Sequence, residues 1–251
     1  MFKNLRKVSV AVLALILTSA SYASFEKSIC GVDDRVPSDM PKIGRLLGSM
    51  SDTGGCTVTM IGKTCAISAG HCSGTFGYAE FNTPPSIDGN IQHPADEDIY
   101  PVDRAKTVYE YSGIGNDWAV LRILPNQITG KYAGDVQGSY EVSFQKPDSG
   151  DIIRITGYGL DRSDPERNLA QQTHTGEITR IRGSALYHVA DTMGGNSGSS
   201  IIRESDGRIV GIHTNGGCYS RGGSNSATVI SENEELREAI EACLIEENQI
   251  Q

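Results

Sequence analysis

The stretch that decides the fold of this chain is Ala190-Asp191-Thr192-Met193-Gly194-Gly195-Asn196-Ser197-Gly198-Ser199-Ser200. Glycine permits sharp turns and lets the backbone approach a bound group closely, because it lacks a Cβ atom. A serine held on such a turn can present its hydroxyl group while neighbouring amide N–H groups point at one spot. Loops rich in glycine, asparagine and serine are also common without any catalytic role. A catalytic role for Ser197 therefore requires a base and an orienting acid elsewhere in the chain.

Both of these groups are present, and each stands beside an apolar segment. His71 follows the segment 64–69, and a histidine can take the serine proton and return it to a leaving group. Asp117 opens the segment 118–123, where its carboxylate can accept the other ring N–H, fix the tautomer and stabilise the charged ring. Alone, either residue could be a strand-end histidine or a turn aspartate. Their joint presence with Ser197 favours nucleophilic catalysis.

Most of the chain predicts short β-strands separated by turn-forming residues. One set is predicted at 43–49, 56–61, 64–69, 76–81, 102–111 and 118–123. After a connection at 125–149, a second set is predicted at 151–157, 173–181, 185–190, 199–203, 208–213 and 226–230. Regularly spaced short strands are typical of barrels and sandwiches. The catalytic candidates would then meet between the two halves.

The C-terminal stretch has a different pattern. Leu236, Ile240 and Leu244 recur every four residues, which predicts one apolar face of a helix at 232–247. Ser231 is the expected N-cap, with Glu234 at the spacing of a capping box.

The first 23 residues predict a cleavable signal peptide. A basic start with Lys3, Arg6 and Lys7 precedes the apolar run 8–17, and small residues place the cut after Ala23. The apolar run is too short to span a bilayer, and no later segment is a candidate. We therefore expect a secreted or periplasmic protein without a membrane or lipid anchor.

Charge excludes two classes of partner. The formal charge of −9 falls to about −12 when the signal peptide is removed. Binding to nucleic acids or to anionic membrane surfaces depends on clustered cations, so neither is expected.

Six cysteines follow Ala23, and in an oxidising compartment an even number favours three disulfides. Sequence alone leaves their pairing open. A zinc site is the rival explanation, but the chain has no CxxC pair and its histidines are scattered. We expect no metal and no cofactor. The acidic cluster 96–98 could bind calcium, although a solvated acidic loop is the favoured interpretation.

Three motifs together resemble those of the chymotrypsin-fold serine proteases. They are Ala69-Gly70-His71-Cys72, Asn116-Asp117-Trp118-Ala119-Val120-Leu121 and Gly195-Asn196-Ser197-Gly198. The resemblance extends from about Cys30 to the final helix. It implies an all-β fold of two six-stranded antiparallel barrels with a C-terminal α-helix, and a catalytic triad of His71, Asp117 and Ser197 in the cleft. It also implies an oxyanion hole formed by the backbone N–H groups of Gly195 and Ser197.

Within that fold the chain is similar to the bacterial glutamyl endopeptidases. The matching stretches are 31–35, 172–176, the Asp191-Thr192 pair and Gly211-Ile212-His213-Thr214-Asn215-Gly216-Gly217. The resemblance implies that Thr192 and His213 bind a substrate glutamate carboxylate, with Thr214, Asn215 and Gly216 completing the substrate-binding wall. An imidazole and a hydroxyl supply the donors that a buried carboxylate needs. Trypsin-like enzymes have an acid at the position of Asp191, but members with the Asp-Thr pair cleave after acidic residues. In this chain Asn196 replaces the aspartate that pairs with a released α-amino group in trypsin-type enzymes.

The resemblance also implies disulfides and boundaries. Cys56–Cys72 corresponds to the family's bridge behind the catalytic histidine. Cys65–Cys243 is compatible with the family's C-terminal helix, which packs on the strand that contains Cys65. Cys30 and Cys218 are then the remaining pair, and their bridge would tie the N-terminal arm to the rim of the specificity pocket. The expected divisions are a signal peptide at 1–23, a first barrel with a short arm at 24–135, a second barrel at 136–231 and a helix at 232–251 packed on the first barrel.

The expected function is that of a secreted, monomeric serine endopeptidase, a peptide-bond hydrolase acting on proteins or peptides. It would cleave through an acyl-enzyme after Glu and more weakly after Asp. Two alternatives remain open at this point. One is a protease of the same fold with a different specificity, and the other is an inactive homologue that binds protein partners through the cleft.

Overall fold

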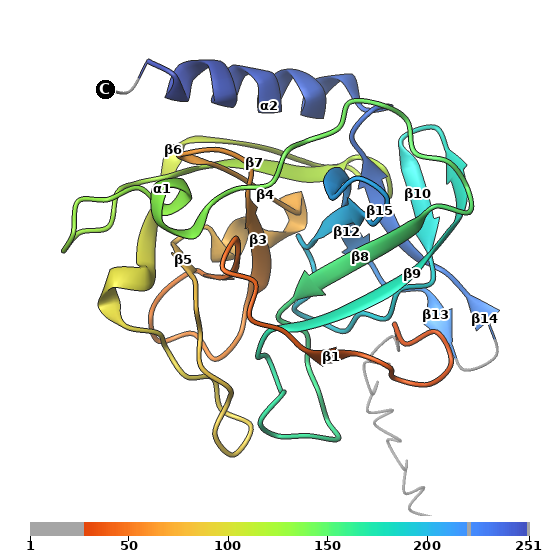
Figure 1. Cartoon of the computed structure of the whole chain (residues 1–251), viewed down its shortest axis with the longest axis horizontal. Coiled ribbons are helices and arrows are strands. Elements are labelled where there is room, and N and C mark those ends of the chain that lie inside the picture. The colour runs from red at the N-terminus through yellow and green to blue at the C-terminus, as the bar shows by residue number, and fades with distance from the viewer. Residues whose placement is uncertain (1–27, 220–221, 250–251) are drawn as a thin grey trace, which may run out of the picture.

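The computed structural model describes residues 28–219 and 222–249, which form two β-barrels and a C-terminal helix (Figure 1). The predicted signal peptide lies outside the described residues. In the described part, no helix is long and apolar enough to cross a membrane.

The first barrel contains six antiparallel strands in the order β2-β3-β4-β7-β6-β5, and the pairing of β2 with β5 closes it. Its strands are β2 (Ile43–Leu47), β3 (Cys56–Met60), β4 (Cys65–Ser68), β5 (Tyr78–Glu80), β6 (Ile99–Tyr111) and β7 (Asp117–Ile123). Each of the six segments predicted for the first half overlaps one of these strands. Two 3₁₀-helices, η1 (Gly70–Thr75) and η2 (Asp96–Asp98), lie in its connections, and the short α1 (Ala133–Gln137) lies between its last strand and the second barrel.

The second barrel is closed by the pairing of β8 with β9. Its six strands are β8 (Ile152–Gly157), β9 (Gln172–Arg182), β10 (Ala185–His188), β11 (Ser200–Arg203), β12 (Arg208–Asn215) and β15 (Asn225–Val229). β1 (Val36–Pro37) adds to the outer edge of β9, and β13 (Cys218–Tyr219) pairs with β14 (Gly222–Gly223) beside the barrel. The structure thus confirms the predicted two-barrel class and adds three short strands that the sequence pattern did not indicate.

The apolar side chains form one core inside each barrel and a third between the barrels and the helix. The third core includes Ile67, Trp118 and Ile212. Every residue of β4 and β7 is buried, because these strands face the barrel interior on one side and α2 or the second barrel on the other. A strand covered on both faces loses the alternation of apolar and polar residues.

The helix α2 (Glu234–Glu247) packs on β7 and β4 (Figure 1). Its N-cap is Asn233, whose Oδ1 accepts a hydrogen bond from the N–H of Leu236 at 2.9 Å. The prediction that Ser231 caps this helix is wrong. Asn233 stands at the position from which a side-chain oxygen reaches the exposed N–H of the first turn.

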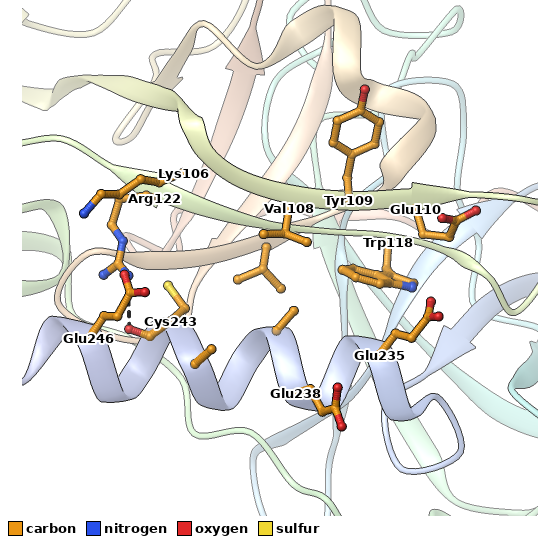
Figure 2. Close-up of a pocket in the computed structure, with 13 residues that line it drawn as sticks. Lys106, Val108, Tyr109, Glu110, Trp118, Arg122, Glu235, Glu238, Cys243 and Glu246 are labelled. Carbon is orange, nitrogen blue, oxygen red and sulfur yellow. Dashed lines mark hydrogen bonds and ion pairs between the residues drawn. The ribbon is translucent and has the colours of Figure 1, made fainter.

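The other end of α2 is attached to the first barrel by a disulfide and by charged side chains. Cys243 is bonded to Cys65, and Glu247 Oε2 accepts from the backbone N–H of Thr64 at 2.7 Å. Arg122 donates to the carbonyl oxygen of Cys243 at 3.3 Å and to Glu246 Oε2 at 2.9 Å. Figure 2 shows Arg122, Cys243 and Glu246 at one end of a groove of about 460 Å³ between α2 and strands β6 and β7.

A buried ion pair joins β2 to β5 within the first barrel. Arg45 Nη2 lies 2.7 Å from Glu80 Oε2, and both side chains are almost fully buried. The same guanidinium donates to the carbonyl oxygens of Gln92 at 2.8 Å and Leu169 at 3.3 Å. Leu169 belongs to the segment leading into β9, so Arg45 also connects the two barrels. Full pairing is required here because an unpaired charge at this depth is very costly.

We predict that Glu80→Ala lowers the free energy of unfolding by about 3–5 kcal/mol, because it leaves the Arg45 charge buried without its partner. The double variant Arg45→Met/Glu80→Leu should lose less than this single variant. Denaturant unfolding followed by circular dichroism measures both. A double variant less stable than Glu80→Ala would contradict this account.

Candidate active site

The barrels bring His71 and Asp117 together at one edge of the first barrel. β4 and β7 are antiparallel neighbours, so the turn that follows β4 lies near the first residue of β7. His71 lies in η1 directly after β4, and Asp117 is that first residue. His71 Nδ1 lies 2.7 Å from Asp117 Oδ2, and the backbone N–H of His71 donates to Asp117 Oδ1 at 3.0 Å. The carboxylate therefore fixes both the ring and the backbone of His71.

This pair determines where the ring proton lies. An ionised carboxylate only accepts hydrogen bonds, so the short contact places a proton on His71 Nδ1 and leaves Nε2 free to accept another. Asp117 is fully buried, whereas the side chain of His71 is about one quarter exposed at 26%. A partly exposed base oriented by a buried acid is the arrangement that activates a serine or cysteine nucleophile.

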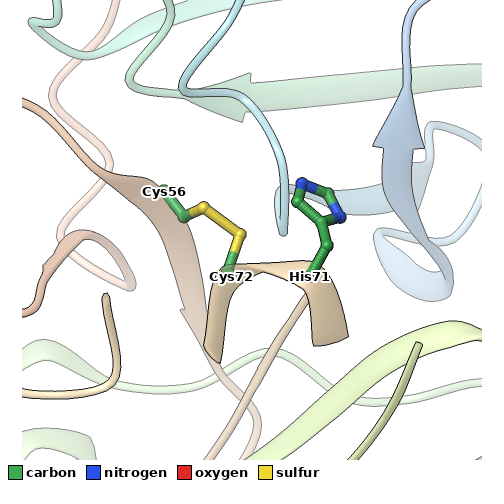
Figure 3. A group of neighbouring side chains, drawn as sticks. All are labelled: Cys56, His71 and Cys72. Atoms are coloured by element: carbon green, nitrogen blue, oxygen red, sulfur yellow. A yellow bond between two sulfur atoms is a disulfide. The ribbon is translucent and has the colours of Figure 1, made fainter. Parts of the chain in front are cut away.

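Figure 3 shows the Cys56–Cys72 disulfide directly beside His71. In the described part of the chain, these three residues are the one set of potential metal ligands whose atoms lie within 4.8 Å of one another. Their sulfur atoms are joined to each other and offer no thiolate. The group is therefore a disulfide that braces the η1 turn of His71.

The acidic cluster 96–98 forms η2. Asp98 Oδ1 accepts hydrogen bonds from the side-chain amides of Asn82 at 3.0 Å and Gln137 at 2.6 Å. Asp96 and Glu97 are exposed. These contacts use Asp98 to fasten η2 to α1.

The serine loop turns sharply because of two glycines. The N–H of Asn196 donates to the carbonyl oxygen of Met193 at 2.9 Å, which closes a turn with Gly195 at φ +104°. A Cβ atom on Gly195 would lie 2.2 Å from the carbonyl oxygen of Tyr158, and one on Gly198 would lie 2.2 Å from Ser68 Oγ. Both positions therefore need glycine for conformation and for space.

A single threonine of the first barrel holds this loop. The backbone N–H of Thr57 donates to the carbonyl oxygen of Ser197 at 2.8 Å, and its Oγ1 donates to that of Gly195 at 2.9 Å. The same Oγ1 accepts from the N–H of Tyr158 at 3.1 Å. Thr57 is fully buried on β3, next to the Cys56–Cys72 disulfide. Ser197 is thus anchored close to His71 by bonds between the barrels.

The amide N–H groups of Gly195 and Ser197 donate no hydrogen bond within residues 28–219 and 222–249. They are free to bind an incoming oxygen. No hydrogen bond joins His71 Nε2 to Ser197 Oγ in the same part of the chain, and such contacts commonly tighten only when substrate is bound.

The five residues implied as the substrate-binding wall come from two segments. Thr192 precedes the serine turn, His213, Thr214 and Asn215 end β12, and Gly216 follows. Thr192 and His213 are buried, and the hydroxyl group of Thr192 has no hydrogen-bond partner. A buried hydroxyl without a partner is costly, so it suits a position that a ligand completes.

The carboxylate of Asp191 is already used by the N-terminal arm, residues 28–35. Its Oδ1 accepts from the N–H of Cys30 at 2.6 Å, and its Oδ2 accepts from the N–H of Asp34 at 3.2 Å. Burial raises the pKa of Asp191, while the two backbone hydrogen bonds and His174 act in the opposite direction. The bound arm makes Asp191 a structural residue here, rather than an acid at the base of a pocket.

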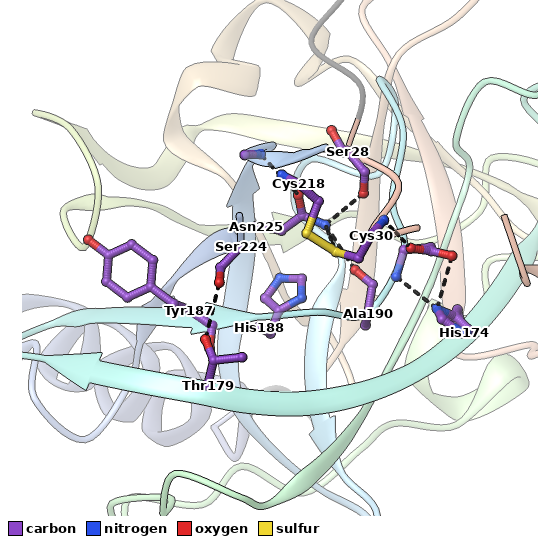
Figure 4. Close-up of a disulfide and its surroundings, with 12 residues drawn as sticks. Ser28, Cys30, His174, Thr179, Tyr187, His188, Ala190, Cys218, Ser224 and Asn225 are labelled. Carbon is purple, nitrogen blue, oxygen red and sulfur yellow. Dashed lines mark hydrogen bonds and ion pairs between the residues drawn. A yellow bond between two sulfur atoms is a disulfide. The ribbon is translucent and has the colours of Figure 1, made fainter. Parts of the chain in front are cut away.

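Figure 4 shows the Cys30–Cys218 disulfide, which ties the arm to β13. The side chain of Asn225 donates to the carbonyl oxygens of Ser28 at 2.8 Å and Ala190 at 2.9 Å. Its Oδ1 accepts from the N–H of Cys218 at 3.1 Å. All three disulfides of the structure have the pairing that the resemblance implied.

His213 contacts a second buried histidine, His188, at the end of β10. His188 Nε2 is 3.2 Å from His213 Nδ1, and the two rings cross at 68°. Burial lowers the pKa of His188 to about 3, and burial followed by the neighbouring His188 lowers the pKa of His213 well below 6.5. Both rings are therefore neutral at pH 7.

The family model described as Trypsin matches residues 31–239. The chain belongs to the trypsin family. It is 32% identical over 140 residues to a glutamyl endopeptidase of Staphylococcus aureus (strain MRSA252), an alignment that covers 55% of this chain and 36% of that protein. A glutamyl endopeptidase of Staphylococcus aureus (strain MW2) is 32% identical over 123 residues, an alignment that covers 48% of this chain and 36% of that protein. The alignments thus span about a third of the length of these curated relatives.

Solved structures agree on the fold. A Glu endopeptidase in complex with MPD superposes with a TM-score of 0.67 at 22% identity, covering 86% of this chain and 99% of that one. A thermostable serine protease AL20 from an extremophilic microorganism gives a TM-score of 0.63 at 14% identity, covering 83% and 99%.

Sequence reasoning found the triad candidates and the pocket segments but missed Thr57 and His188. Alternation gave a signal for His188, because it shares the inward face of β10 with the fully buried Leu186. Thr57 gave no signal, since its partners are backbone atoms more than 100 residues away in the chain.

We predict that Thr57→Val lowers the free energy of unfolding by about 1–3 kcal/mol, because it leaves the carbonyl of Gly195 and the N–H of Tyr158 without their partner. The matched control is Thr59→Val on the same strand. Thr59 donates only to the hydroxyl of Ser200, at 3.1 Å, and that hydroxyl can reorient. Denaturant unfolding should show the larger loss for Thr57→Val, and equal losses would contradict the anchoring role.

The neutral His188 predicts an acid-sensitive contribution to stability. Between pH 6.5 and about 3, the unfolded chain binds a proton at this residue that the folded chain does not bind. The free energy of unfolding should therefore fall as the pH drops through this window, by about 1 kcal/mol per pH unit, and the contribution is fully present above pH 6.5. His188→Phe should show a shallower loss between pH 7 and pH 5 in denaturant unfolding. Equal slopes for the two proteins would refute the neutral state.

Proposed function

We propose that the chain is a serine endopeptidase that hydrolyses peptide bonds through an acyl-enzyme. The observation that carries this proposal is the double hydrogen bond of buried Asp117 to His71, set beside an anchored Ser197. Ser197 Oγ attacks the peptide carbonyl, and His71 Nε2 takes its proton and passes it to the leaving amine. Water then repeats these steps to release the acyl group.

The oxyanion that forms in each step needs donors that are fixed in advance. The unused N–H groups of Gly195 and Ser197 supply them, with the turn at Gly195 held by Thr57. Such donors contribute much of the rate enhancement in acyl transfer, because they need no reorganisation as the charge develops.

We further propose that cleavage occurs after Glu and more weakly after Asp. The unpaired hydroxyl of Thr192 and the neutral ring of His213 are donors for a substrate carboxylate. An acid at Asp191 would instead attract a cationic side chain, but the arm occupies that carboxylate. The alignment with two glutamyl endopeptidases supports the same specificity.

Export is part of the proposal. The predicted signal peptide at 1–23 would deliver the chain to a compartment where its three disulfides form and persist. The partners are protein or peptide substrates, and the working form is a monomer. We assign the first barrel and its arm to residues 24–135, the second barrel to 136–231 and the helix to 232–251.

Two assays test the proposal. A fluorophosphonate probe should label the wild-type protein at Ser197 and fail to label Ser197→Ala. A panel of peptides that differ only in the residue before the scissile bond should give the highest kcat/KM for Glu, a lower value for Asp and little cleavage after Gln, Arg or Phe.

The outcomes separate the alternatives. Absence of an adduct at Ser197 in folded wild-type protein would favour the inactive, partner-binding homologue. Labelling combined with faster cleavage after Arg or Phe would retain the protease and overturn the specificity for Glu.

A further inference from the structure

The groove between α2 and strands β6 and β7 begins at the strand ends that hold the catalytic candidates (Figure 2). Glu110 and Trp118 line the groove. The residue after Glu110 is Tyr111, whose ring centroid lies 5.7 Å from that of His71, and the residue before Trp118 is Asp117. Successive side chains of a strand point to opposite faces. The groove therefore lies on the reverse face of the strand ends that contact His71.

The groove has an apolar surface that is open to solvent. Val108 of β6 is 54% exposed, and Ala239 and Ala242 line the groove from the side of α2. Trp118 is only 3% exposed, and its indole N–H has no acceptor within residues 28–219 and 222–249. A buried donor without an acceptor is rare, so this N–H suits a position that an incoming group completes.

Three carboxylates surround the end of the groove that contains Trp118. They are Glu110 of β6 and Glu235 and Glu238 of α2 (Figure 2). In the part of the chain that the structure describes, none of the three takes part in an ion pair or a side-chain hydrogen bond. Negative charge without a partner is thus concentrated beside an apolar surface and an unused N–H donor.

The side chain of lysine or arginine matches this combination. Its methylene groups cover apolar surface while its charged end remains among acidic groups. A cation placed between like charges also relieves their mutual repulsion. An anionic segment would instead meet the three carboxylates. Among the residues lining the groove it could pair with Lys106 at the opposite end, since Arg122 is already bound to Glu246 at 2.9 Å.

We propose that this groove binds a basic and apolar segment of a protein substrate, with a lysine or arginine side chain among Glu110, Glu235 and Glu238 and an acceptor for the indole N–H of Trp118. This inference rests on the proposed function, in which the chain cleaves proteins. The groove touches no reacting atom, so its occupant adds binding energy to the ground state and the transition state alike. Such binding lowers KM and leaves kcat unchanged.

Trp118 is the one tryptophan of the sequence, so its fluorescence reports directly on the groove. The titration uses Ser197→Ala, to prevent cleavage, and a peptide made of lysine, leucine and glycine. A matched peptide has glutamine in place of each lysine. The basic peptide should shift the emission of Trp118 until the shift saturates, and added salt should weaken its binding. The glutamine peptide should give no saturable shift.

A triple glutamine variant, Glu110→Gln/Glu235→Gln/Glu238→Gln, removes the three charges with little change of shape. It should bind the basic peptide about tenfold more weakly or worse. The matched control is Glu241→Gln, an exposed residue of the same helix that does not line the groove. This control should bind the peptide as tightly as the parent protein.

Two substrates connect the groove to catalysis. Both contain the same short peptide with Glu before the scissile bond, and one of them also carries the basic segment on a flexible glycine-serine linker. The wild-type protein should show a KM about tenfold lower for the linked substrate, with equal kcat. The triple glutamine variant should lose this difference and cleave the short peptide as the wild-type protein does.

Several results would overturn the proposal. One is an emission of Trp118 that the basic peptide leaves unchanged, and another is equal binding of the glutamine peptide. Unchanged binding by the triple glutamine variant would have the same meaning. An emission that changes with protein concentration, without any peptide, would assign the groove to a second copy of the chain instead.

The two proposals fail in different ways. If the wild-type protein cleaves no peptide but the titration succeeds, the proposed function fails and the groove remains a site for a basic segment. If the wild-type protein cleaves after Glu and the titration fails, only the role of the groove fails.

Discussion

The serine loop belongs to the second barrel, but it is held in place by the first. Thr57 forms this connection with its backbone N–H and its hydroxyl group, which together bind the carbonyl oxygens of Ser197 and Gly195. The hydroxyl also receives the N–H of Tyr158, so its hydrogen-bonding capacity is used in both directions. His71 and Asp117 both lie on the first barrel. The relative position of nucleophile and base is therefore a property of the interface between the barrels, and of neither barrel alone.

The carboxyl groups of Asp117 and Asp191 have different roles because they bind different partners. Asp117 and Asp191 are both buried, and each accepts two hydrogen bonds. Asp117 binds the ring and the backbone of one histidine, and so it influences a group that can transfer protons. Asp191 binds two backbone N–H groups of the arm, which do not exchange protons as acids or bases near neutral pH. The same residue type therefore contributes to chemistry in one place and to architecture in the other.

Much of the fold could be predicted because its signals are local in the sequence. Short segments separated by turn-forming residues marked the twelve strands of the barrels, and the motifs around His71, Asp117 and Ser197 indicated how the halves meet. The three added strands are only two residues long, too short to show any alternation. The N-cap was assigned to Ser231 instead of Asn233, since both residue types can cap a helix and a shift of two residues is invisible in the sequence.

The parts of the site that could not be predicted all depend on contacts between distant segments. The engagement of Asp191 by the arm joins residues that are 161 positions apart. The contact of His188 with His213 joins two strands that are not neighbours in the sheet. A sequence pattern predicts which face of a strand a residue occupies, but it does not predict which side chain from a distant strand contacts that residue.

The spacing of the disulfides sets the order in which a newly made chain can complete its fold. Cys56 and Cys72 are 16 residues apart and are available to each other early in synthesis. Cys30 and Cys65 must wait for partners that are 188 and 178 residues further along. The arm beside Thr192 and the helix on the first barrel are thus fastened only when almost the whole chain has been made. A chain interrupted between Ser197 and Cys218 has His71 and Ser197 but lacks the Cys30–Cys218 bridge, so the covalent attachment of the arm comes only after the catalytic candidates have been synthesised.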